Sequence, residues 1–491
     1  MEAEKIEELE IEGTKAQAEE SEKNKEVVKQ GVHNYSTEES YVWPTDPSVC
    51  RKLEWFRDQK LALMVHWGPY SQLGLVESWA LSDEDAEWSR NGIDWEVTGK
   101  EFKEQYFGLN RTFNPIRFEP EKWADIAKES GIRYLIFTTK HHDGFCMWDS
   151  RFSEYKITSQ DCPFHTNRYA DICGHLFESF RKRGIGIAAY FSKADWHIDS
   201  YWAKGRERGD YMWRGPSYKP EEDKETWEKF VQFTQNQIKE LGSNYGKIDI
   251  MWFDFSYDDM VGEKWRATDL VRMIRKLQPG IIIDNRTQLE QDLWTPEQYQ
   301  PLEWIRHKET GELVTWEACQ TFSGSWCYYR DETTWKSPEM LIRMLVNTVS
   351  LGGNLLMNVG PTSRGYIDQR AKDALKVYED WMSVNSRSIY NCTMAEPEFK
   401  APADCRFTQS VDGKRLYVHL FAYPYAHLQL RGLAGKVDYA QFLHDGSELL
   451  LTEGKVDHFS EGAAHAEDLL VINLPPVKPN VVVPVIELFL K

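Results

Sequence analysis

Short hydrophobic runs that end on polar residues recur along the chain from about residue 60 onward. Several of them are separated by segments in which apolar residues recur every three or four positions. The runs have the length of buried strands, and the segments between them have the period of amphipathic helices. The predicted strands are residues 61–68, 132–142, 184–192, 247–254, 280–286, 313–322 and 354–361.

Helices that alternate with strands predict a parallel sheet, because consecutive parallel strands need a long crossover connection. Seven or eight such units within roughly 330 residues suit a (β/α)8 barrel better than an open doubly wound sheet. The predicted fold class is therefore α/β, with a (β/α)8-like, or TIM, barrel. The predicted helices are residues 121–131, 175–184, 225–242, 267–280 and 340–353.

After about residue 392 the pattern changes to short alternating runs separated by turn residues, with no helical period. This pattern predicts a C-terminal antiparallel β-sandwich of roughly 100 residues. The predicted domains are an N-terminal arm at 1–40, the barrel at 41–391 and the sandwich at 392–491. The sandwich strands are expected within residues 414–423, 427–433, 436–446, 468–475 and 481–491.

Charge and cysteine content exclude several classes of protein. The net charge of −19 argues against nucleic acid or an anionic membrane surface as a partner, since both bind basic faces. The arm at 1–40 holds 12 acidic and 5 basic residues, which gives −7 of that charge, and is expected to be helical or disordered. Eight scattered cysteines without a CxxC pair indicate free thiols rather than a disulfide scaffold or a zinc site.

No apolar stretch is long enough to span a bilayer, and the first residues lack the apolar core of a signal peptide. As written, the sequence predicts a cytoplasmic protein. If a leader was removed, the protein would instead be periplasmic, secreted or lysosomal. The sequence leaves open whether the protein forms homo-oligomers.

Polar residues stand at the carboxyl ends of the predicted strands. In a (β/α)8 barrel these ends converge on the active site, so residues far apart in sequence should meet there. Any one of them could be a satisfied loop residue, but polar groups at seven successive strand ends are hard to explain in that way. They are His66, Trp67, His141, His142, Tyr190, Trp252, Asp254, Asn285, Arg286, Glu317 and Asn358.

These residues lack the patterns of metal or cofactor chemistry. The sequence has no GxxxxGK phosphate loop and no GxSxG elbow, so no cofactor is predicted. The first strand ends on His66-Trp67-Gly68 rather than His-x-His, and the adjacent side chains of His141 and His142 should diverge from an extended backbone. No metal site is therefore predicted. Carboxylates, histidines, an arginine and aromatics suit glycoside hydrolysis, which needs two carboxyl groups, hydroxyl-binding groups and an apolar wall.

Four motifs carry a family resemblance: HWGPYSQ (66–72), TTKHHDGFCMWDS (138–150), the aspartate after MWF (251–254) and GGNLLMNVGP (352–361). Together they resemble the α-L-fucosidases of glycoside hydrolase family 29, in order and over roughly residues 45–391. The resemblance implies a (β/α)8-like catalytic domain, a C-terminal β-sandwich and a retaining mechanism without a metal. This architecture agrees with the one predicted from the hydrophobic pattern.

The resemblance implies a nucleophile at the end of the fourth strand, two residues after a tryptophan. Asp254, which follows Trp252, occupies that position. In relatives a glycine or tryptophan often follows the nucleophile, whereas this chain has Phe255, so the shape of the next loop is in question. Asp258 and Asp259, beyond the strand, are expected to be solvated loop acids.

The acid/base implied by the resemblance lies on a variable loop. TPEQY (295–299) resembles its context and supplies Glu297, while Glu317 in TWEACQTF (315–322) is the alternative. Glu297 is favoured for proton transfer and Glu317 for support of the pocket.

The resemblance also implies a sugar pocket with hydroxyl-binding histidines, an arginine and an aromatic wall for the fucose methyl group. Glu77 is a secondary candidate, because the family glutamate usually stands directly before the tryptophan, whereas here the order is Glu77-Ser78-Trp79. Asn358 is expected to hold the barrel end together. The implied substrate-binding residues are His66, Trp79, His141, His142, Tyr190, Trp252, Arg286 and Glu317.

The leading prediction is a retaining exo-α-L-fucosidase that removes terminal fucose from oligosaccharides, glycans or glycoconjugates. The alternative is a non-catalytic fucose-binding protein on the same scaffold, which would keep the histidines and lose the carboxylate pair. Because Asp254 is present, catalysis is favoured. A metal-dependent barrel hydrolase is a more distant third. Relatives include broad enzymes and enzymes that prefer α-1,3/1,4 linkages, and the sequence leaves the linkage open.

Overall fold

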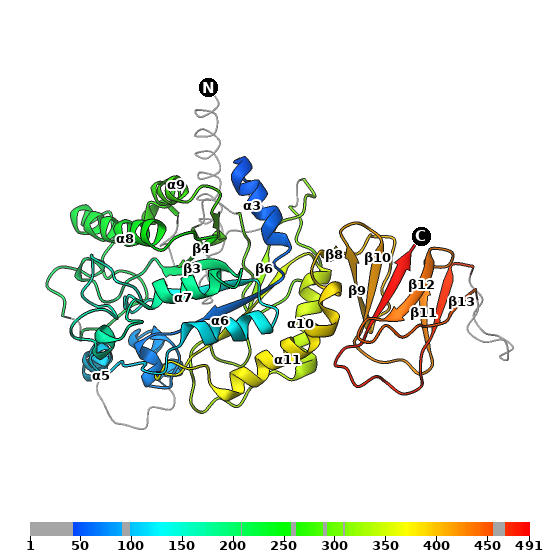
Figure 1. Ribbon diagram of the computed structural model, residues 1–491. Helices are drawn as coiled ribbons and strands as arrows, with labels where there is room; N and C mark the ends of the chain where they lie inside the picture. Colours follow the sequence, from blue (N-terminus) through cyan, green and yellow to red (C-terminus); the bar gives the residue numbers. More distant parts are fainter. Residues whose placement is uncertain are drawn as a thin grey trace.

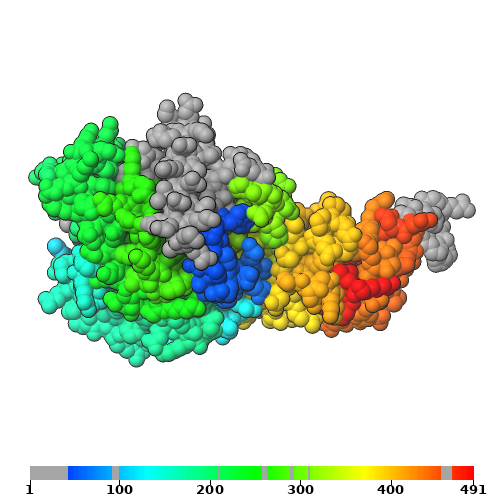
Figure 2. Space-filling model, turned by 90° about the horizontal axis from the view of Figure 1, so that it is seen from above, coloured from blue at the N-terminus to red at the C-terminus, as the bar shows by residue number. Residues whose placement is uncertain are grey.

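The computed structural model describes residues 43–90, 99–207, 209–256, 262–287, 292–307, 310–454 and 467–491. These residues form a large α/β body and a smaller unit of antiparallel strands that projects from one side of it (Figures 1 and 2). The acidic arm predicted at 1–40 and the loop acids Asp258 and Asp259 lie outside the described residues. No helix in the described ranges is long and apolar enough to cross a membrane.

The α/β body is built on a sheet of seven parallel strands in the order β5-β4-β3-β2-β1-β7-β6. Each strand lies within one of the seven predicted runs, so the predicted strands and the barrel-like α/β class are confirmed. The strands are β1 Leu61–Val65, β2 Tyr134–Lys140, β3 Gly186–Ser192, β4 Ile250–Asp254, β5 Ile282–Ile283, β6 Glu317–Thr321 and β7 Asn354–Val359.

A segment that the hydrophobic pattern did not predict fills the gap between the edge strands β5 and β6. Residues 293–298 form isolated parallel bridges to Asp284 on one side and to Trp316 and Cys319 on the other. Backbone N–H groups of Asn285 and Cys319 donate to the carbonyls of Leu293 (2.9 Å) and Pro296 (2.8 Å). The segment escapes sequence detection because it is short and contains a proline, which interrupts a strand pattern.

Helices pack around the sheet, and all five predicted helices are present. The side chains of Asp171, Asp223, Ser337 and Asp368 cap the starts of four helices by accepting a backbone N–H three residues on. The predicted helices are α6 Pro120–Glu129, α7 Ile172–Arg181, α8 Lys224–Asn244, α9 Ala267–Leu277 and α10 Pro338–Ser350. The sequence pattern did not predict four further helices, which are α3 Pro47–Arg57, α4 Ala86–Ser89, α5 Gly99–Phe107 and α11 Gln369–Asn385.

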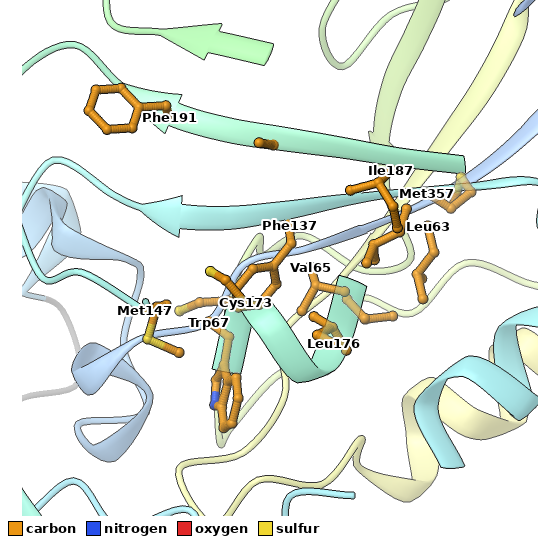
Figure 3. Close-up of a cluster of buried hydrophobic side chains, with 14 of the residues drawn as sticks. Leu63, Val65, Trp67, Phe137, Met147, Cys173, Leu176, Ile187, Phe191 and Met357 are labelled. Atoms are coloured by element: carbon orange, nitrogen blue, oxygen red, sulfur yellow. The ribbon is translucent and has the colours of Figure 1, made fainter. Parts of the chain in front are cut away.

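Two apolar clusters lie on the two faces of the barrel strands. Leu63 and Val65 of β1 face outward, and Figure 3 shows them with neighbouring strand residues beside Cys173 and Leu176 of α7. Ala62 and Met64 alternate with them and face the barrel interior. Val49, Leu53 and Phe56 of α3 join this inner cluster and close the amino end of the barrel. The carboxyl end is therefore where the interior can open to ligand.

The C-terminal unit consists of two antiparallel sheets around their own apolar core, which confirms the predicted sandwich. It rests on the helices of the α/β body, where Trp381 Nε1 of α11 donates to the carbonyl of Val483 (3.2 Å). One sheet has the order β12-β15-β10-β9-β8 and the other the order β11-β14-β13. The strands are β8 Cys392–Met394, β9 Cys405–Ser410, β10 Arg415–Leu420, β11 His427–Arg431, β12 Val437–Phe442, β13 Leu451–Glu453, β14 Leu469–Asn473 and β15 Val485–Leu490.

Candidate active site

The strand alternation carries a carboxylate into the mouth of the barrel. Ile250 and Trp252 of β4 belong to the interior cluster, whereas Met251 and Phe253 belong to the outer one. Asp254 is two residues after Trp252, so its side chain points to the same side of the strand. It therefore faces the interior at the carboxyl end of the strand. An apolar run can therefore end on an acid without placing that acid in the helix-packed core.

The carboxylate of Asp254 is held from three directions. Oδ2 accepts a hydrogen bond from the Tyr190 hydroxyl (2.6 Å). Oδ1 accepts from Arg286 Nη1 (2.8 Å) and from the backbone N–H of Phe255 (2.7 Å). Burial and the neighbouring Asp254 charge raise the pKa of Tyr190 well above its ordinary value, so the phenol remains a donor. Asp254 is thus fixed in one orientation before any ligand binds.

The residue after Asp254 turns the chain sharply out of the strand. Phe255 has a φ of 77°, a left-handed conformation that costs a non-glycine residue roughly 1–3 kcal/mol. Its buried ring packs against His142, with ring centroids 5.1 Å apart. The departure from the family pattern at this position is therefore accommodated by a strained backbone and by aromatic packing.

Arg286 joins two carboxylates of the site. It lies in the short turn η8 Asn285–Thr287, just after β5. Its Nη1 donates to Asp254, its Nη2 donates to Glu297 Oε2 (2.5 Å), and its guanidinium lies 4.2 Å from the Trp252 ring centroid. Buried charges are costly unless they are paired, and this arginine pairs with both acids, although its single positive charge offsets only one of the two negative charges.

Lys193, which sequence reasoning missed, braces the turns that carry Asp254 and Arg286. Its ammonium is fully buried and donates to the backbone carbonyls of Asp254 (2.8 Å) and Arg286 (2.8 Å). Burial lowers its pKa to about 7. The only sequence signal was a lysine directly after an apolar strand, a position that is more often solvated.

The two glutamates proposed for proton transfer lie in different places. Glu297 stands on the gap-filling segment, its side chain is 20% exposed, and it lines an open cleft. Glu317 is 0% exposed; Tyr134 donates to its Oε2 (2.6 Å) and Trp252 Nε1 to its Oε1 (2.8 Å). Glu317 is therefore buried inside the barrel and accepts a hydrogen bond from Trp252, whereas Glu297 faces the cleft.

Glu317→Gln is expected to change how stability depends on pH. Burial raises the pKa of Glu317 to about 7, against the hydrogen bonds from Tyr134 and Trp252, which lower it. Between the unfolded value near 4.5 and about 7, the folded wild type binds more protons at this group than the unfolded chain. The group's contribution to the free energy of unfolding therefore falls as pH rises through this window, by up to about 3 kcal/mol.

The variant lacks this titration, so its stability relative to wild type should rise between about pH 5 and about pH 8. Urea unfolding of both proteins at the two pH values measures the difference. A difference that stays the same at both values would contradict a raised pKa at Glu317.

Three buried histidines surround the Tyr190 side of the site. Each uses Nδ1 for a hydrogen bond: His66 with Asn358 Oδ1 (2.7 Å), His141 with Ser78 Oγ (2.6 Å) and His142 with Ser192 Oγ (2.8 Å). Burial lowers the pKa of His66 to about 4 and that of His141 well below its ordinary value. His66 and His141 are therefore neutral near pH 7. Because His66 Nδ1 donates to the amide oxygen of Asn358, His66 Nε2 can only accept from a hydroxyl group. His141 Nδ1 faces a hydroxyl, which can donate or accept, so either role is open to His141 Nε2.

The expectation that His141 and His142 diverge is wrong. Their ring centroids lie 4.0 Å apart, and the rings are tilted by 38°. The reason is that β2 ends at Lys140 and the chain then turns, with the Gly144 N–H donating to the His141 carbonyl (3.1 Å). A group of three or more histidine, cysteine or carboxylate side chains suited to a metal ion is nonetheless absent from the described part of the chain.

A cleft of about 710 Å³ opens above these residues. Glu77, Trp79, Glu297 and Trp326 are among its lining residues, whereas Asp254 is connected to it through Arg286 and Glu297. The Trp79 ring contacts His142, with centroids 4.8 Å apart. Burial raises the pKa of Glu77 to about 7, and its Oε1 accepts the Cys327 N–H (2.7 Å).

Trp326 was missed from the sequence and lies against His66, with ring centroids 5.3 Å apart. Asn358 contacts both residues. Its Oδ1 forms a hydrogen bond with His66 Nδ1, and its side-chain amide N–H donates to the Trp326 carbonyl. A tryptophan in a Gly-Ser loop after β6 was the available signal.

Two of the strand-end residues do not face the site. Trp67 packs outward against Phe113, Phe118 and Trp123. Asn285 is fully buried and its Oδ1 accepts from the Thr295 N–H (3.2 Å), which ties β5 to the gap-filling segment.

Comparison with known proteins identifies relatives of one kind. A family model described as α-L-fucosidase matches residues 28–387. The tissue α-L-fucosidase of Rattus norvegicus is 28% identical over 388 residues, which is 73% of each chain. The α-L-fucosidase of Dictyostelium discoideum is 27% identical over 358 residues, which is 68% of this chain and 71% of the relative.

Solved structures of similar proteins have the same overall fold. Isoenzyme 1 of the α-L-fucosidase from Paenibacillus thiaminolyticus superposes with a TM-score of 0.76 at 34% identity, covering 90% of this chain and 100% of that one. A glycoside hydrolase family 29 α-L-fucosidase from Bacteroides thetaiotaomicron, trapped as a covalent intermediate with 2-fluoro-fucosyl fluoride, has a TM-score of 0.70 at 25% identity. It covers 91% of this chain and 97% of the other.

Proposed function

This chain belongs to the α-L-fucosidase family, glycoside hydrolase family 29, and we propose that it is a retaining exo-enzyme in which Asp254 forms a covalent bond to fucose. The substrate is a fucosylated oligosaccharide, glycan or glycoconjugate with a terminal α-L-fucose. The observation that carries the proposal is the pairing of Asp254 and Glu297 by one guanidinium group, at the open end of the barrel.

One arginine donates to both carboxylates, which places them in the same site as a pair. A pair of carboxyl groups is what glycoside hydrolysis requires. The trapped intermediate of the Bacteroides relative supports the same chemistry.

In the first step, a carboxylate oxygen of Asp254 attacks the anomeric carbon of fucose. The bond from that carbon to the glycosidic oxygen breaks, and the leaving oxygen takes a proton from Glu297. Tyr190 and Arg286 hold Asp254 in the required orientation. The positive charge that develops on the sugar is favoured by the carboxylates around it.

In the second step, Glu297 takes a proton from water, and the water oxygen displaces Asp254 from the anomeric carbon. The second step needs the ionised glutamate, which acts as the base, and the first step needs its protonated form. Because Arg286 donates to Glu297 in the structure, we expect a bound substrate to separate this pair.

Glu297 suits proton transfer better than Glu317. Glu297 lines the cleft, where the leaving group must pass, while Glu317 accepts two hydrogen bonds inside the barrel and is 0% exposed. A general acid has to come within hydrogen-bond distance of the oxygen that it protonates. We assign Glu317 to support of Trp252.

The remaining residues form the sugar pocket in this proposal. Nδ1 of His66 and of His141 is engaged within the protein, so we assign their Nε2 atoms to fucose hydroxyls. Trp79, His142, Tyr190, Trp252 and Arg286 complete the pocket. Trp252 and Tyr190, stacked with centroids 5.5 Å apart, provide the apolar wall for the fucose methyl group.

Wild-type protein is expected to release fucose from 4-nitrophenyl α-L-fucoside and from a fucosylated trisaccharide. Proton NMR of early time points should show the α-anomer of fucose first, since two displacements retain the configuration. First appearance of the β-anomer would contradict the covalent mechanism. Binding of fucose without release from either substrate would favour the non-catalytic alternative.

A further inference from the structure

The cleft that contains Glu297 and Trp79 continues to an exposed tryptophan. Trp88, on the short helix α4, lines this cleft and is 48% exposed. Large aromatic side chains bury much apolar area when covered, and an indole ring is a flat apolar surface with a polar edge. A half-exposed indole inside a binding cleft is therefore a candidate contact for ligand.

Trp88 is anchored rather than loosely attached. Its Nε1 donates to Asp85 Oδ1 (3.0 Å), and Asp85 is almost fully buried. Arg214 holds the same carboxylate with two hydrogen bonds, from Nε to Oδ2 (2.9 Å) and from Nη2 to Oδ1 (2.6 Å). A bidentate arginine–carboxylate pair gives a defined geometry, so the indole edge is fixed while about half of the residue stays exposed.

Two chain segments are tied together to build this anchor. The Asp83 N–H donates to the Met212 carbonyl (2.9 Å), and the Met212 N–H donates to Asp83 Oδ2 (2.8 Å). The Arg214 N–H donates to Glu84 Oε2 (2.8 Å). The position of Trp88 thus depends on contacts between residues more than 100 positions apart in the sequence.

The anchor adjoins the proposed fucose pocket. The Arg214 guanidinium lies 5.9 Å from the Trp79 ring centroid, and Trp79 contacts His142 of the pocket. Going outward, the order is therefore His142, Trp79, the Arg214–Asp85 pair and Trp88. Trp88 and Glu297 line the same cleft, so with fucose at the inner end Trp88 would face the leaving group.

Two of the acids that line the cleft are paired with arginines, Asp85 with Arg214 and Glu297 with Arg286. The ammonium group of Lys336 donates to the backbone carbonyl of Thr321 (2.6 Å). Gln298 and several serine and threonine side chains also line the cleft. Amide and hydroxyl groups suit sugar hydroxyls.

We propose that Trp88 is the platform of a binding site for the sugar to which fucose is attached, a neutral pyranose of an extended oligosaccharide. This inference rests on the proposed function and adds the class of substrate to it. One face of a pyranose carries mainly C–H bonds and can lie on the exposed indole face, while its hydroxyls meet the polar lining of the cleft.

Trp88→Ala tests the site. We compare kcat/KM for a neutral fucosylated trisaccharide with kcat/KM for α-L-fucosyl fluoride, which has no second sugar. The ratio of the two values should fall by about tenfold to a hundredfold in Trp88→Ala, because the stacking contact is lost. Trp88→Phe keeps an aromatic face and should restore much of the ratio.

Phe152→Ala is the matched control, because Phe152 is 44% exposed but does not line the cleft. Its ratio should equal that of wild type. The proposal is overturned if the ratio in Trp88→Ala stays within twofold of wild type, or if Phe152→Ala lowers the ratio as much. Failure of the proposed function is seen separately, as absence of wild-type turnover of fucosyl fluoride, and would overturn both.

Discussion

Asp254→Ala is expected to lower kcat for fucose release by on the order of 10⁴-fold or more, on every fucoside tested. The side chain is the nucleophile in the proposed mechanism, and no other described carboxylate shares its contacts with both Tyr190 and Arg286. The variant should fold, because Asp254 is the last residue of β4 and Arg286 keeps its ion pair with Glu297.

Two measurements check this prediction. Steady-state turnover of 4-nitrophenyl α-L-fucoside gives the loss, and thermal unfolding by circular dichroism shows whether the fold is kept. Added azide can enter the space left by the carboxylate and attack the anomeric carbon directly. It should partly restore turnover of the aryl fucoside and give a β-fucosyl azide.

Asp249→Asn is the matched control, since Asp249 is a buried aspartate just before β4, at the opposite end of the same strand. Its Oδ2 accepts the Ile187 N–H (2.9 Å), and its Oδ1 pairs with Lys52. Its replacement should reduce stability and leave kcat largely unchanged. Near wild-type activity of Asp254→Ala would refute the nucleophile assignment.

Glu297→Gln is expected to give the second-largest effect, and one that depends on the leaving group. With the trisaccharide, whose sugar leaving group needs a proton, kcat/KM should fall by roughly 10²–10⁴-fold. Fluoride leaves without such help, so formation of the covalent intermediate from fucosyl fluoride should be affected far less. The amide oxygen of glutamine can still accept from Arg286, so packing of the site is kept.

The same variant also lacks the base of the second step. The covalent intermediate should therefore accumulate with fucosyl fluoride and be detectable by mass spectrometry as one fucosyl unit on a peptide that contains Asp254. Azide, which needs no base, should release it.

Glu317→Gln distinguishes the two glutamates. If Glu317 supports Trp252, its loss should affect the trisaccharide and fucosyl fluoride to the same extent. A loss that depends on the leaving group in Glu317→Gln, together with an equal loss on both substrates in Glu297→Gln, would reverse the assignment.

The sequence by itself determined the elements and much of the site. The alternation of apolar runs and helical segments predicted seven strands, five helices and the C-terminal sandwich, because burial of one face imposes a local period on each element. The same local logic predicted that Asp254, His66 and Arg286 would meet, since parallel strands bring their carboxyl ends to one side. The resemblance of the four motifs to a known family then added the reaction that is expected of these residues.

Only the tertiary structure decided which neighbours each side chain has. Trp67 and His66 are adjacent in sequence, yet Trp67 belongs to the outer core, whereas His66 packs against Tyr190 of the inner cluster. The approach of His141 to His142 depends on a turn, and the segment of Glu297 is held by bridges to β6, far along the chain. These contacts are made between elements rather than within them, so the hydrophobic pattern of a single element does not predict them.

Two further features are also contacts between different segments of the chain. One is the position of Arg286 between two carboxylates, and the other is the anchoring of Trp88 by Asp85 and Arg214. Each depends on distances between segments tens to more than a hundred residues apart, which only close packing of the folded chain establishes.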